Sequence, residues 1–387
     1  MNDILDDEAI SVRPTTAYVD LDALAYNFRN IREKVGSSRI MAVVKANAFG
    51  HGLLRIAQEL EKLGVDQLGV AFLEEGIALR RSGVTCPILV LGGIIGNQID
   101  YFLEFDLQLT ASSTFKVHQI DEAAKRLGKR AQIHLKIDCG MRRIGVRAEN
   151  AHQLFEAALE AQHCETVGIF THFSSSDSAD REISLRQIDQ FEHATRYFER
   201  EGLKMPPRHM ANSGAILQYP EASYEIVRPG CLLYGFYPSS EVAQTVQVKP
   251  VMTLKSRVVY FKQVSAGQGV SYNSTWLAPQ DTRVVTIPVG YGDGYSRGLS
   301  GKAEVLINGR RYPVIGNITM DALMVDIGQD SAFNGDEVVL LGRQGAEKIE
   351  PSELAKYLDT IPYEILTSIN TRVPRRYIGG VRTAGLD

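Results

Sequence analysis

The chain has 387 residues, 44% of them hydrophobic and 23% charged, and a formal net charge of −4. This length exceeds one ordinary domain, and the composition is typical of a globular protein with a full hydrophobic core. The net charge is slightly negative, and the sequence has no block of basic residues. It also has no apolar run of the roughly 20 residues that a membrane span needs. We therefore expect neither a nucleic-acid partner nor a membrane partner.

Residues 1–13 form a short acidic tail that lacks the positive and apolar regions of a secretory signal. The four cysteines, Cys86, Cys139, Cys164 and Cys231, are scattered without metal-ligand spacing. The sequence thus predicts free thiols, no metal site and a cytoplasmic location.

Residues 14–240 alternate short β-branched runs with helical patterns. Apolar residues recur every three or four positions from Leu21 to Val35, and further helical patterns stop at Gly64 and Gly202. We expect strands at 39–45, 67–72, 87–92, 106–110, 131–138, 167–172, 208–211 and 226–234. Eight β-α units of this size predict a TIM (β/α)8 barrel. A doubly wound open sheet is the alternative, but no GxGxxG follows the first strand.

Residues 241–387 have a different texture, typical of a mostly antiparallel β domain. Strands are expected at 252–264, 283–289, 303–307, 312–315, 323–327 and 337–341. Asn308-Gly309 predicts a tight hairpin between two of them. One short helix is expected at 352–358.

Lys45 ends the first predicted barrel strand and precedes a loop punctuated by Gly50 and Gly52. Barrel enzymes place their chemistry at the carboxyl ends of the strands. Lys45 is therefore either a rim ammonium paired with a carboxylate or an amine desolvated enough to act as a base or Schiff-base nucleophile.

Other polar residues follow later strands at the same predicted rim. Taken one at a time, these residues have ordinary structural interpretations. His172 could be a structural histidine, and Arg143 and Arg228 could be solvated or ion-paired arginines. Asn212-Ser213 could cap a helix. Together, a serine hydroxyl and glycine amides opposite a lysine indicate a phosphate cradle. A phosphate anchor with an electrophile-seeking lysine is what pyridoxal 5′-phosphate requires.

The chain resembles the bacterial alanine racemases along nearly its whole length, from Thr15 to about Tyr377. The segments that carry the resemblance stand in the family's order. They are 42–52 (AVVKANAFGHG), 136–145 (KIDCGMRRIG), 171–173 (THF), 211–213 (ANS), 228–230 (RPG), 234–235 (YG), 269–272 (GVSY), 290–295 (GYGDGY), 320–321 (MD) and 372–375 (RVPR).

The resemblance implies a barrel followed by a β domain, paired as a homodimer in which each active site combines one protomer's barrel with its partner's β domain. It also implies two-base racemisation of L- and D-alanine, which supplies D-alanine for peptidoglycan. Lys45 would tether the cofactor and serve as one base, and Tyr272 from the partner would serve as the other. Because a free tyrosine has a pKa of about 10, nearby cations must favour its phenolate, and His172 with Arg228 are the candidates.

The family also implies roles for further residues. Arg228 would face the pyridine nitrogen and, as a pure donor, keep it unprotonated. Arg143 would contact the phenolic oxygen of the cofactor and, with the backbone amide of Met320, orient the substrate carboxylate. Tyr291 and Arg297 would line the entrance. In some members the residue matching Lys136 is carbamylated and braces the arginine. The phosphate would be held by Asn212, Ser213 and the backbone amides of Gly230 and Cys231.

Two positions depart from the family pattern. Phe49 and Thr371 stand where tyrosines are common, so the phosphate end loses hydroxyl contacts and the substrate side gains room. A serine-accepting or broader-specificity racemase is therefore an alternative. A decarboxylase of the same fold would need a carboxylate in place of Arg228, and a non-catalytic cofactor carrier would lack the second half.

Overall fold

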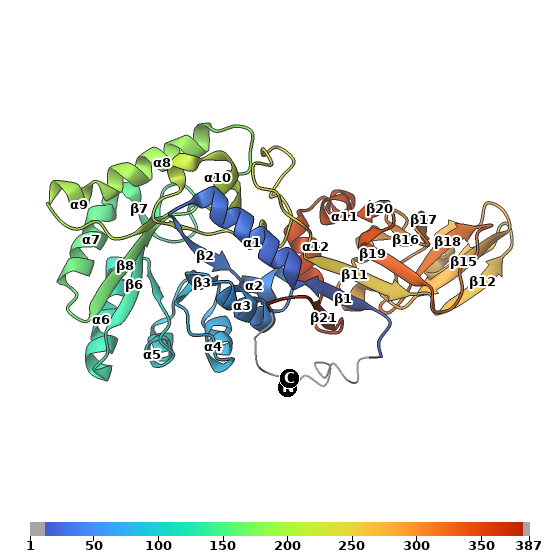
Figure 1. The fold of residues 1–387 in the computed structure, drawn as a ribbon, viewed down its shortest axis with the longest axis horizontal. Helices are drawn as coiled ribbons and strands as arrows, with labels where there is room; N and C mark the ends of the chain where they lie inside the picture. The colour runs from blue at the N-terminus through green and yellow to red at the C-terminus, as the bar shows by residue number, and fades with distance from the viewer. Residues whose placement is uncertain (1–11, 382–387) are drawn as a thin grey trace. The chain divides into compact units, whose positions relative to one another are not determined.

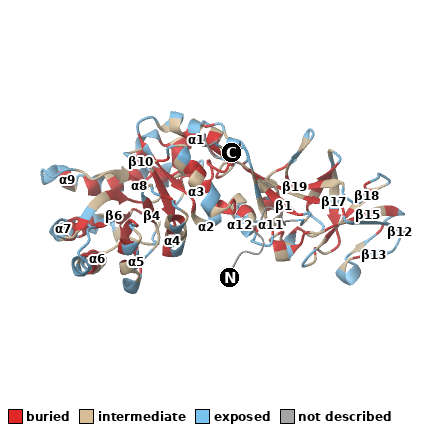
Figure 2. Ribbon diagram, turned by 60° about the horizontal axis from the view of Figure 1, so that its bottom comes forward, coloured by how far each residue is buried: buried red, intermediate tan, exposed pale blue. Residues whose placement is uncertain are grey.

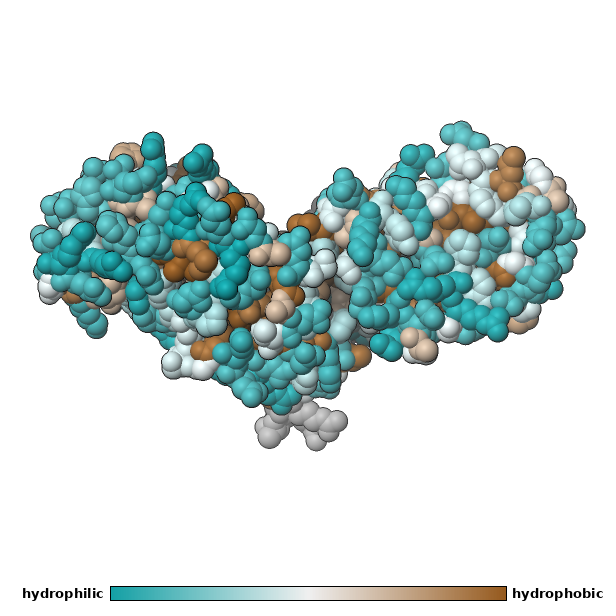
Figure 3. All heavy atoms as spheres, turned by 90° about the horizontal axis from the view of Figure 1, so that it is seen from above, coloured by the Kyte–Doolittle hydropathy of each residue, from teal (hydrophilic) through white to brown (hydrophobic). Residues whose placement is uncertain are grey.

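The computed structural model describes residues 12–381, which form two compact units (Figure 1). The barrel unit comprises residues 24–48 and 53–249, and the sheet unit comprises residues 12–23, 49–52 and 250–381. The predicted tail, residues 1–13, lies almost wholly outside the described residues. Within residues 12–381, no helix has both the length and the apolar character of a membrane span. Most of the surface drawn in Figure 3 is hydrophilic, with small scattered apolar patches.

Eight parallel strands form the barrel, as the sequence predicts. Seven of the pairings around the ring join neighbouring strands, and all seven are parallel. The eighth is a single parallel bridge between Leu89 and Gln108, which closes the ring. The strands, in ring order, are β2 (Arg39–Val43), β3 (Gln67–Val70), β4 (Ile88–Val90), β5 (Leu109–Ala111), β6 (Ala131–Asp138), β8 (Cys164–Phe170), β9 (Arg208–His209) and β10 (Ile226–Val227).

Amphipathic helices surround these strands (Figure 1). Their apolar faces are buried, and the strands are buried along most of their length, so the core lies between helices and barrel (Figure 2). The helices are α1 (Leu21–Val35), α3 (Leu53–Lys62), α4 (Leu73–Arg81), α5 (Ile99–Glu104), α6 (Thr114–Leu127), α7 (Ala151–Glu160), α8 (Glu182–Thr195), α9 (Tyr197–Arg200) and α10 (Ser213–Gln218). A two-residue strand, β7 (Val146–Arg147), pairs in parallel with the end of β6.

The sheet unit is mostly antiparallel, which confirms the predicted fold class. Asn308 and Gly309 have φ values of 51° and 76°, the left-handed conformation that a type I′ hairpin requires. The strands are β1 (Thr16–Asp20), β11 (Met252–Arg257), β12 (Tyr260–Val264), β13 (Gly269–Val270), β14 (Trp276–Leu277), β15 (Thr282–Ile287), β16 (Glu304–Ile307), β17 (Arg310–Ile315), β18 (Leu323–Gly328), β19 (Glu337–Gln344), β20 (Glu347–Ile349) and β21 (Arg375–Ile378). Two helices, α11 (Pro351–Leu358) and α12 (Pro362–Ser368), accompany them.

Several predicted boundaries differ from the structure. The sequence places residues 16–20 in the first domain, but β1 pairs with β11 and β21 of the sheet unit. The strand expected at 226–234 ends at Val227, because Pro229 and the turns after it cannot continue a ladder. The strand expected at 252–264 is two strands, and helix α12 was not predicted.

Candidate active site

The carboxyl ends of neighbouring barrel strands bring the predicted cations together. Lys45 follows β2, Arg143 follows β6, and Arg228 follows β10. The charges of Arg143 and Arg228 both lower the pKa of Lys45, and Arg228 lies 3.2 Å from His172. Among the described residues, none of the ion pairs involves Lys45, Arg143 or Arg228. The rim is therefore an electropositive site suited to an anionic ligand.

Lys45 opens a left-handed turn, α2 (Lys45–Phe49), in which residues 46–49 all have φ between 52° and 54°. This conformation costs a non-glycine residue roughly 1–2 kcal/mol, so surrounding contacts must hold it. The Glu75 carboxylate accepts the amide that follows Lys45 at 2.7 Å, and Asn47 Oδ1 accepts the Leu53 amide at 2.8 Å. The lysine is thus fixed at the strand end by a strained, well-braced turn.

The Lys45 amine has a lowered pKa. Burial is the main cause, and the charges of Arg143 and Arg228 add to it, while Glu75 opposes it. Both desolvation and like charge favour the neutral amine, which is the nucleophilic form. Of the two alternatives for Lys45, this environment favours the reactive amine.

Arg228 is only 4% exposed and is held by several acceptors. Its Nη1 donates to His209 Nδ1 at 2.9 Å, and its Nη2 donates to the carbonyls of Thr171 and Met210 at 2.8 and 3.1 Å and to His172 Nδ1 at 3.2 Å. Burial lowers the pKa of Arg228 to about 9, which leaves it charged at neutral pH. Nη2 has two hydrogens for its three acceptors, so one of them is shared, while the Nε–H and one Nη1–H are left for a ligand.

A chain of neutral side chains runs from Arg228 into the barrel interior. His209 Nε2 lies 2.8 Å from His134 Nδ1, and His134 Nε2 lies 2.9 Å from Gln108 Oε1. Because Arg228 can only donate, His209 must accept at Nδ1 and donate from Nε2, and His134 must then do the same. The burial of both rings lowers their pKa values, that of His134 to about 3, so both are uncharged.

The sequence did not identify His209, His134 and Gln108 as part of the site. Each lies within a predicted strand, but one-residue shifts in register decide which side chains point into a barrel.

His172 is also neutral, which corrects the expectation that it is a cation beside the tyrosine. Burial and the charge of Arg228 lower its pKa well below the ordinary value. Its Nδ1 accepts from Arg228, so its Nε2 carries the proton and is a donor. Of the pair, only Arg228 carries a charge that could favour a phenolate.

Ser213, Gly230 and Cys231 meet beyond β9 and β10. The Ser213 hydroxyl is buried and accepts the Gly230 amide at 2.9 Å. Asn212 Oδ1 caps α10 at the Ala215 amide, 3.0 Å away, so its oxygen is already committed. A phosphate at this cradle would take the place of the contact between Ser213 and Gly230.

Lys136 lies under the same rim and is 3% exposed. Its Nζ donates to the Ile137 carbonyl at 2.9 Å and lies 5.0 Å from the Phe170 ring centre. Burial, followed by the charge of Arg228, lowers its pKa to about 7. A large fraction of this amine is therefore neutral at physiological pH.

Three predicted site residues belong to the sheet unit and are exposed. Tyr272 begins a 3₁₀ turn (Tyr272–Ser274) and is 69% exposed, while Met320 and Tyr291 are 53% and 43% exposed. Ser271, directly before Tyr272, is anchored to the Asn317 carbonyl at 2.6 Å, and Asn317 donates to the Tyr272 carbonyl at 2.8 Å. The backbone at Tyr272 is thus fixed although its side chain is exposed.

The rim fits pyridoxal phosphate. It offers an amine of lowered pKa for the aldehyde carbon, a donor-only guanidinium for the ring nitrogen and a hydroxyl with two neighbouring amides for the phosphate. The excess positive charge, which no carboxylate among the described residues pairs with, suits a phosphate and a substrate carboxylate.

Comparison with known proteins identifies the family. The model of the alanine racemase N-terminal domain matches residues 19–238, and that of the C-terminal domain matches residues 251–377. The chain belongs to the alanine racemase family. An alanine racemase of Carboxydothermus hydrogenoformans is 42% identical over 95% of this chain and all of the relative.

Solved structures agree with this assignment. The alanine racemase of Bacillus anthracis with bound L-Ala-P has a TM-score of 0.89 at 37% identity, covering 95% of each chain. A histidine racemase of Leuconostoc mesenteroides has a TM-score of 0.87 at 28% identity, covering 95% of this chain and 99% of the other. The similarity to alanine racemases is the greater one and does not favour the decarboxylase, carrier or broader-specificity alternatives.

Proposed function

We propose that the chain interconverts L- and D-alanine at the carboxyl end of its barrel, with pyridoxal phosphate tethered to Lys45. The observation that carries this proposal is a desolvated amine beside a buried, donor-only cation in a chain of the alanine racemase family. When bound, the cofactor supplies an electron sink for the carbanion that forms as the Cα proton leaves.

Racemisation requires a base on each face of the carbanion, because a single base tends to return the proton to the side it came from. We assign the D-face to the Lys45 amine, whose lowered pKa favours the neutral form that accepts a proton. The L-face belongs to Tyr272 of the partner subunit. Its exposure within the sheet unit supports delivery to another chain's barrel. The charge of Arg228 and the Nε2–H of His172 would favour its phenolate.

Arg228 sets the reaction type. A guanidinium donates a hydrogen bond and cannot supply the proton that a decarboxylase or transaminase gives to the ring nitrogen through a carboxylate. Weaker electron withdrawal limits side reactions and leaves proton exchange as the main outcome. Arg143 and the Met320 amide would hold the substrate carboxylate, Ser213, Gly230 and Cys231 would hold the phosphate, and Tyr291 would narrow the entrance.

This assignment implies a homodimer with composite active sites. The free cysteines support a reducing compartment, and we propose the cytoplasm. There the product D-alanine would serve peptidoglycan synthesis.

Proton NMR in deuterium oxide tests the reaction directly. The loaded enzyme is expected to exchange the Cα proton of both L- and D-alanine and to convert each into a racemic mixture. Lys45→Ala should show neither process. Release of carbon dioxide, or exchange with retention of configuration only, would contradict the proposal.

A further inference from the structure

Asp293 of the sheet unit has a completely buried carboxylate, two residues after the proposed entrance residue Tyr291. Two arginines from opposite ends of the chain pair with it. Arg13 Nη2 lies 2.6 Å and Arg372 Nε lies 3.3 Å from Asp293 Oδ1. The other oxygen, Oδ2, accepts the Gly290 amide at 3.1 Å. A buried carboxylate is costly unless it is paired, but one arginine would neutralise its charge, so the second is not needed for burial alone.

Arg372 also bonds a second carboxylate, that of Asp321. Its Nη2 donates to Asp321 Oδ1 at 2.6 Å, while its Nε faces Asp293. The guanidinium can bond both carboxylates because its nitrogens point in different directions, whereas a lysine has only one nitrogen. The side chains of Arg372 and Asp321 are 44% and 64% exposed, and exposed pairs contribute little to stability. The ion-pair bridge Asp321–Arg372–Asp293 therefore has more to do with the position of the two turns it joins.

One of these turns contains Met320, whose amide is the proposed donor to the substrate carboxylate. The Tyr291 amide donates to the Thr319 carbonyl at 3.0 Å, and the Gly292 amide donates to the Met320 carbonyl at 2.9 Å. The Met320 amide itself donates to no acceptor among residues 12–381. The backbone on both sides of this amide is thus fixed, and its N–H stays available for a ligand.

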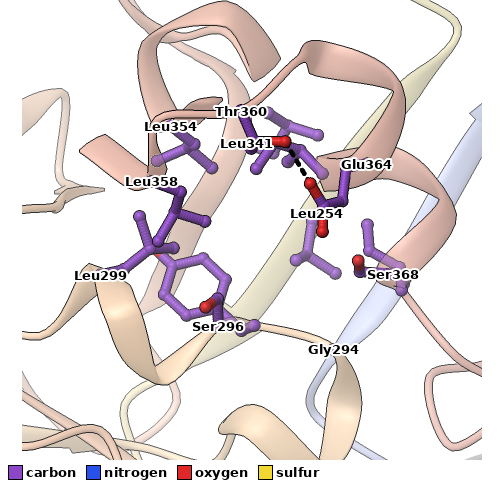
Figure 4. A pocket seen from close by; sticks show the side chains of 13 residues that line it. Leu254, Gly294, Ser296, Leu299, Leu341, Leu354, Leu358, Thr360, Glu364 and Ser368 are labelled. Carbon is purple, nitrogen blue, oxygen red and sulfur yellow. Dashed lines mark hydrogen bonds between the residues drawn. The ribbon is translucent and has the colours of Figure 1, made fainter. Parts of the chain in front are cut away.

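Close backbone packing couples the turn at residues 290–294 to the Met320 peptide. A side chain on Gly290 would collide with the carbonyls of Thr319 and Met320. At the other end of the turn, Gly294 has a φ of 93°, and a side chain there would collide with the Ser368 carbonyl. Gly294 and Ser368 both border the cavity beside α12 that Figure 4 shows. The turn is packed between α12 and the Met320 peptide, so a shift of the turn would move that peptide too.

We propose that Arg372 is a positioning residue for substrate binding, which joins Asp321 to Asp293 and so directs the Met320 amide at the substrate carboxylate. This role rests on the proposed function, in which that amide binds the carboxylate of alanine. Arg372 itself does not touch the substrate. Because the carboxylate is bound alike before and during proton exchange, loss of the ion-pair bridge should raise KM for alanine and leave kcat nearly unchanged.

Substitutions of Asp321 test this role with little risk to folding, because Asp321 is exposed. For Asp321→Ala we expect KM for L- and D-alanine to rise about tenfold, the effect of losing one hydrogen bond to a charged group. Asp321→Asn keeps an acceptor oxygen for Arg372 Nη2 and should recover most of the loss. Arg310→Gln removes an exposed pair with Asp330 in the same unit and should leave KM unchanged.

Arg372→Lys tests the bridging residue itself. The lysine keeps a positive charge beside Asp293, but its single nitrogen cannot bond both carboxylates. We expect the same rise in KM as for Asp321→Ala, and the two changes together should add nothing further, because both break the same ion-pair bridge.

A titration with propionate gives a readout that does not depend on catalysis. Propionate has the carboxylate of alanine without its amine, and it is added to the full-length holoenzyme labelled with ¹⁵N-methionine. We expect it to shift the Met320 amide signal, which is assigned by its loss in Met320→Leu. Asp321→Ala should weaken propionate binding about tenfold, and Arg310→Gln should not change it.

Three results would overturn the positioning role. The first is a wild-type KM and propionate affinity in Asp321→Ala and Arg372→Lys while the unaltered enzyme racemises alanine. The second is a loss of kcat and thermal stability in these variants without a rise in KM, which is the behaviour of a purely structural pair. The third is a Met320 amide signal that propionate does not shift. If the unaltered enzyme does not racemise alanine, the proposed function fails, and the propionate titration then decides the role of Arg372 by itself.

Discussion

Two arginines, one in each unit, show different uses of the same side chain. Arg311 in the sheet unit bonds three carboxylates, those of Glu304, Glu347 and Glu353, at 3.0, 3.0 and 2.7 Å. These hydrogen bonds raise its pKa. Arg228 in the barrel unit is far more buried, yet its acceptors are carbonyls and neutral imidazoles, and its pKa is lowered.

The difference separates structural cations from functional ones. A buried charge without a counter-ion costs several kcal/mol, and folding alone gives no reason to keep it. Carboxylates around Arg311 neutralise it and fix the local sheet. Neutral acceptors around Arg228 fix its direction while leaving its charge available to a ligand.

Substitution of Arg228 should have the largest effect. Arg228→Gln removes the positive charge and most of the hydrogen-bond donors. We expect kcat for racemisation to fall about 100- to 1000-fold, which is the usual effect of removing one preorganised hydrogen-bond donor from an active site. Arg208→Gln is the matched control, since Arg208 begins the neighbouring barrel strand β9 and is paired with Glu225. If Arg228→Gln keeps half of the wild-type kcat, Arg228 has no role in the reaction.

Mixing two inactive variants tests whether the units of different chains share a site. Lys45→Ala and Tyr272→Phe each disable one base, but a mixed dimer would contain one intact pair. Random reassortment makes half of the dimers mixed, and one of their two sites works, so about a quarter of wild-type activity should return. If activity stays at the level of the separate variants, both bases come from one chain.

The histidine behind Arg228 should matter less. His209→Leu removes the acceptor of the Arg228 Nη1 hydrogen bond, and we expect a loss of about tenfold in kcat, typical of a supporting contact. His209→Asn offers an acceptor oxygen in the place of Nδ1 and should recover most of the loss. Equal activity of the two variants would contradict a positioning role.

Lys136 gives a prediction about pH. Its folded-state pKa of about 7 lies below the unfolded value, so the unfolded chain binds more protons between about pH 7 and 10.5. This residue therefore lowers stability as pH falls through that window. Lys136→Met should raise the free energy of unfolding by about 2–4 kcal/mol at pH 7 and by much less at pH 10, as measured by urea titration in bicarbonate-free buffer. If the gain in the free energy of unfolding is the same at pH 7 and pH 10, burial does not lower the pKa of the Lys136 amine.

Substitution of Arg311 should have the smallest effect, and it should change stability and not activity. Arg311→Gln leaves three carboxylates close together, so we expect a loss of about 2 kcal/mol in stability with unchanged kcat. Thermal unfolding and steady-state kinetics measure the two quantities separately. If kcat falls by more than the fraction of folded protein does, Arg311 also affects the reaction, and the contrast between a structural Arg311 and a functional Arg228 is wrong.

The sequence predicted the barrel well because each strand is a short β-branched run between helical patterns. It failed where distant pairing decides the structure. β1 has a barrel-like sequence but pairs with residues near 253 and 376, and no local pattern reports such partners. Helix α12 is only seven residues long, which gives too few turns for a clear periodicity.

The candidate residues could be found from motifs, but not their states. Ala46, Asn47 and Ala48 give no local signal of a left-handed turn, since the braces at Glu75 and Leu53 are side-chain and tertiary contacts. The neutrality of His172 follows from its burial beside Arg228, which only the fold reveals. Residue types indicate the chemistry, and packing sets the protonation.

The closure of the barrel at one bridge has a kinetic consequence. Leu89 and Gln108 form the seam, held by the Gln108 amide to the Ile88 carbonyl at 2.8 Å and the Val90 amide to the Gln108 carbonyl at 3.1 Å. The side chain of Gln108 also belongs to the hydrogen-bond chain that begins at Arg228, since it accepts from His134 and donates to Gln132. Local opening of the ring should begin at this seam and would release Arg228 from its fixed direction. Heat should therefore inactivate the enzyme before the helices melt, with the Gln108 amide among the first of the barrel strands to exchange.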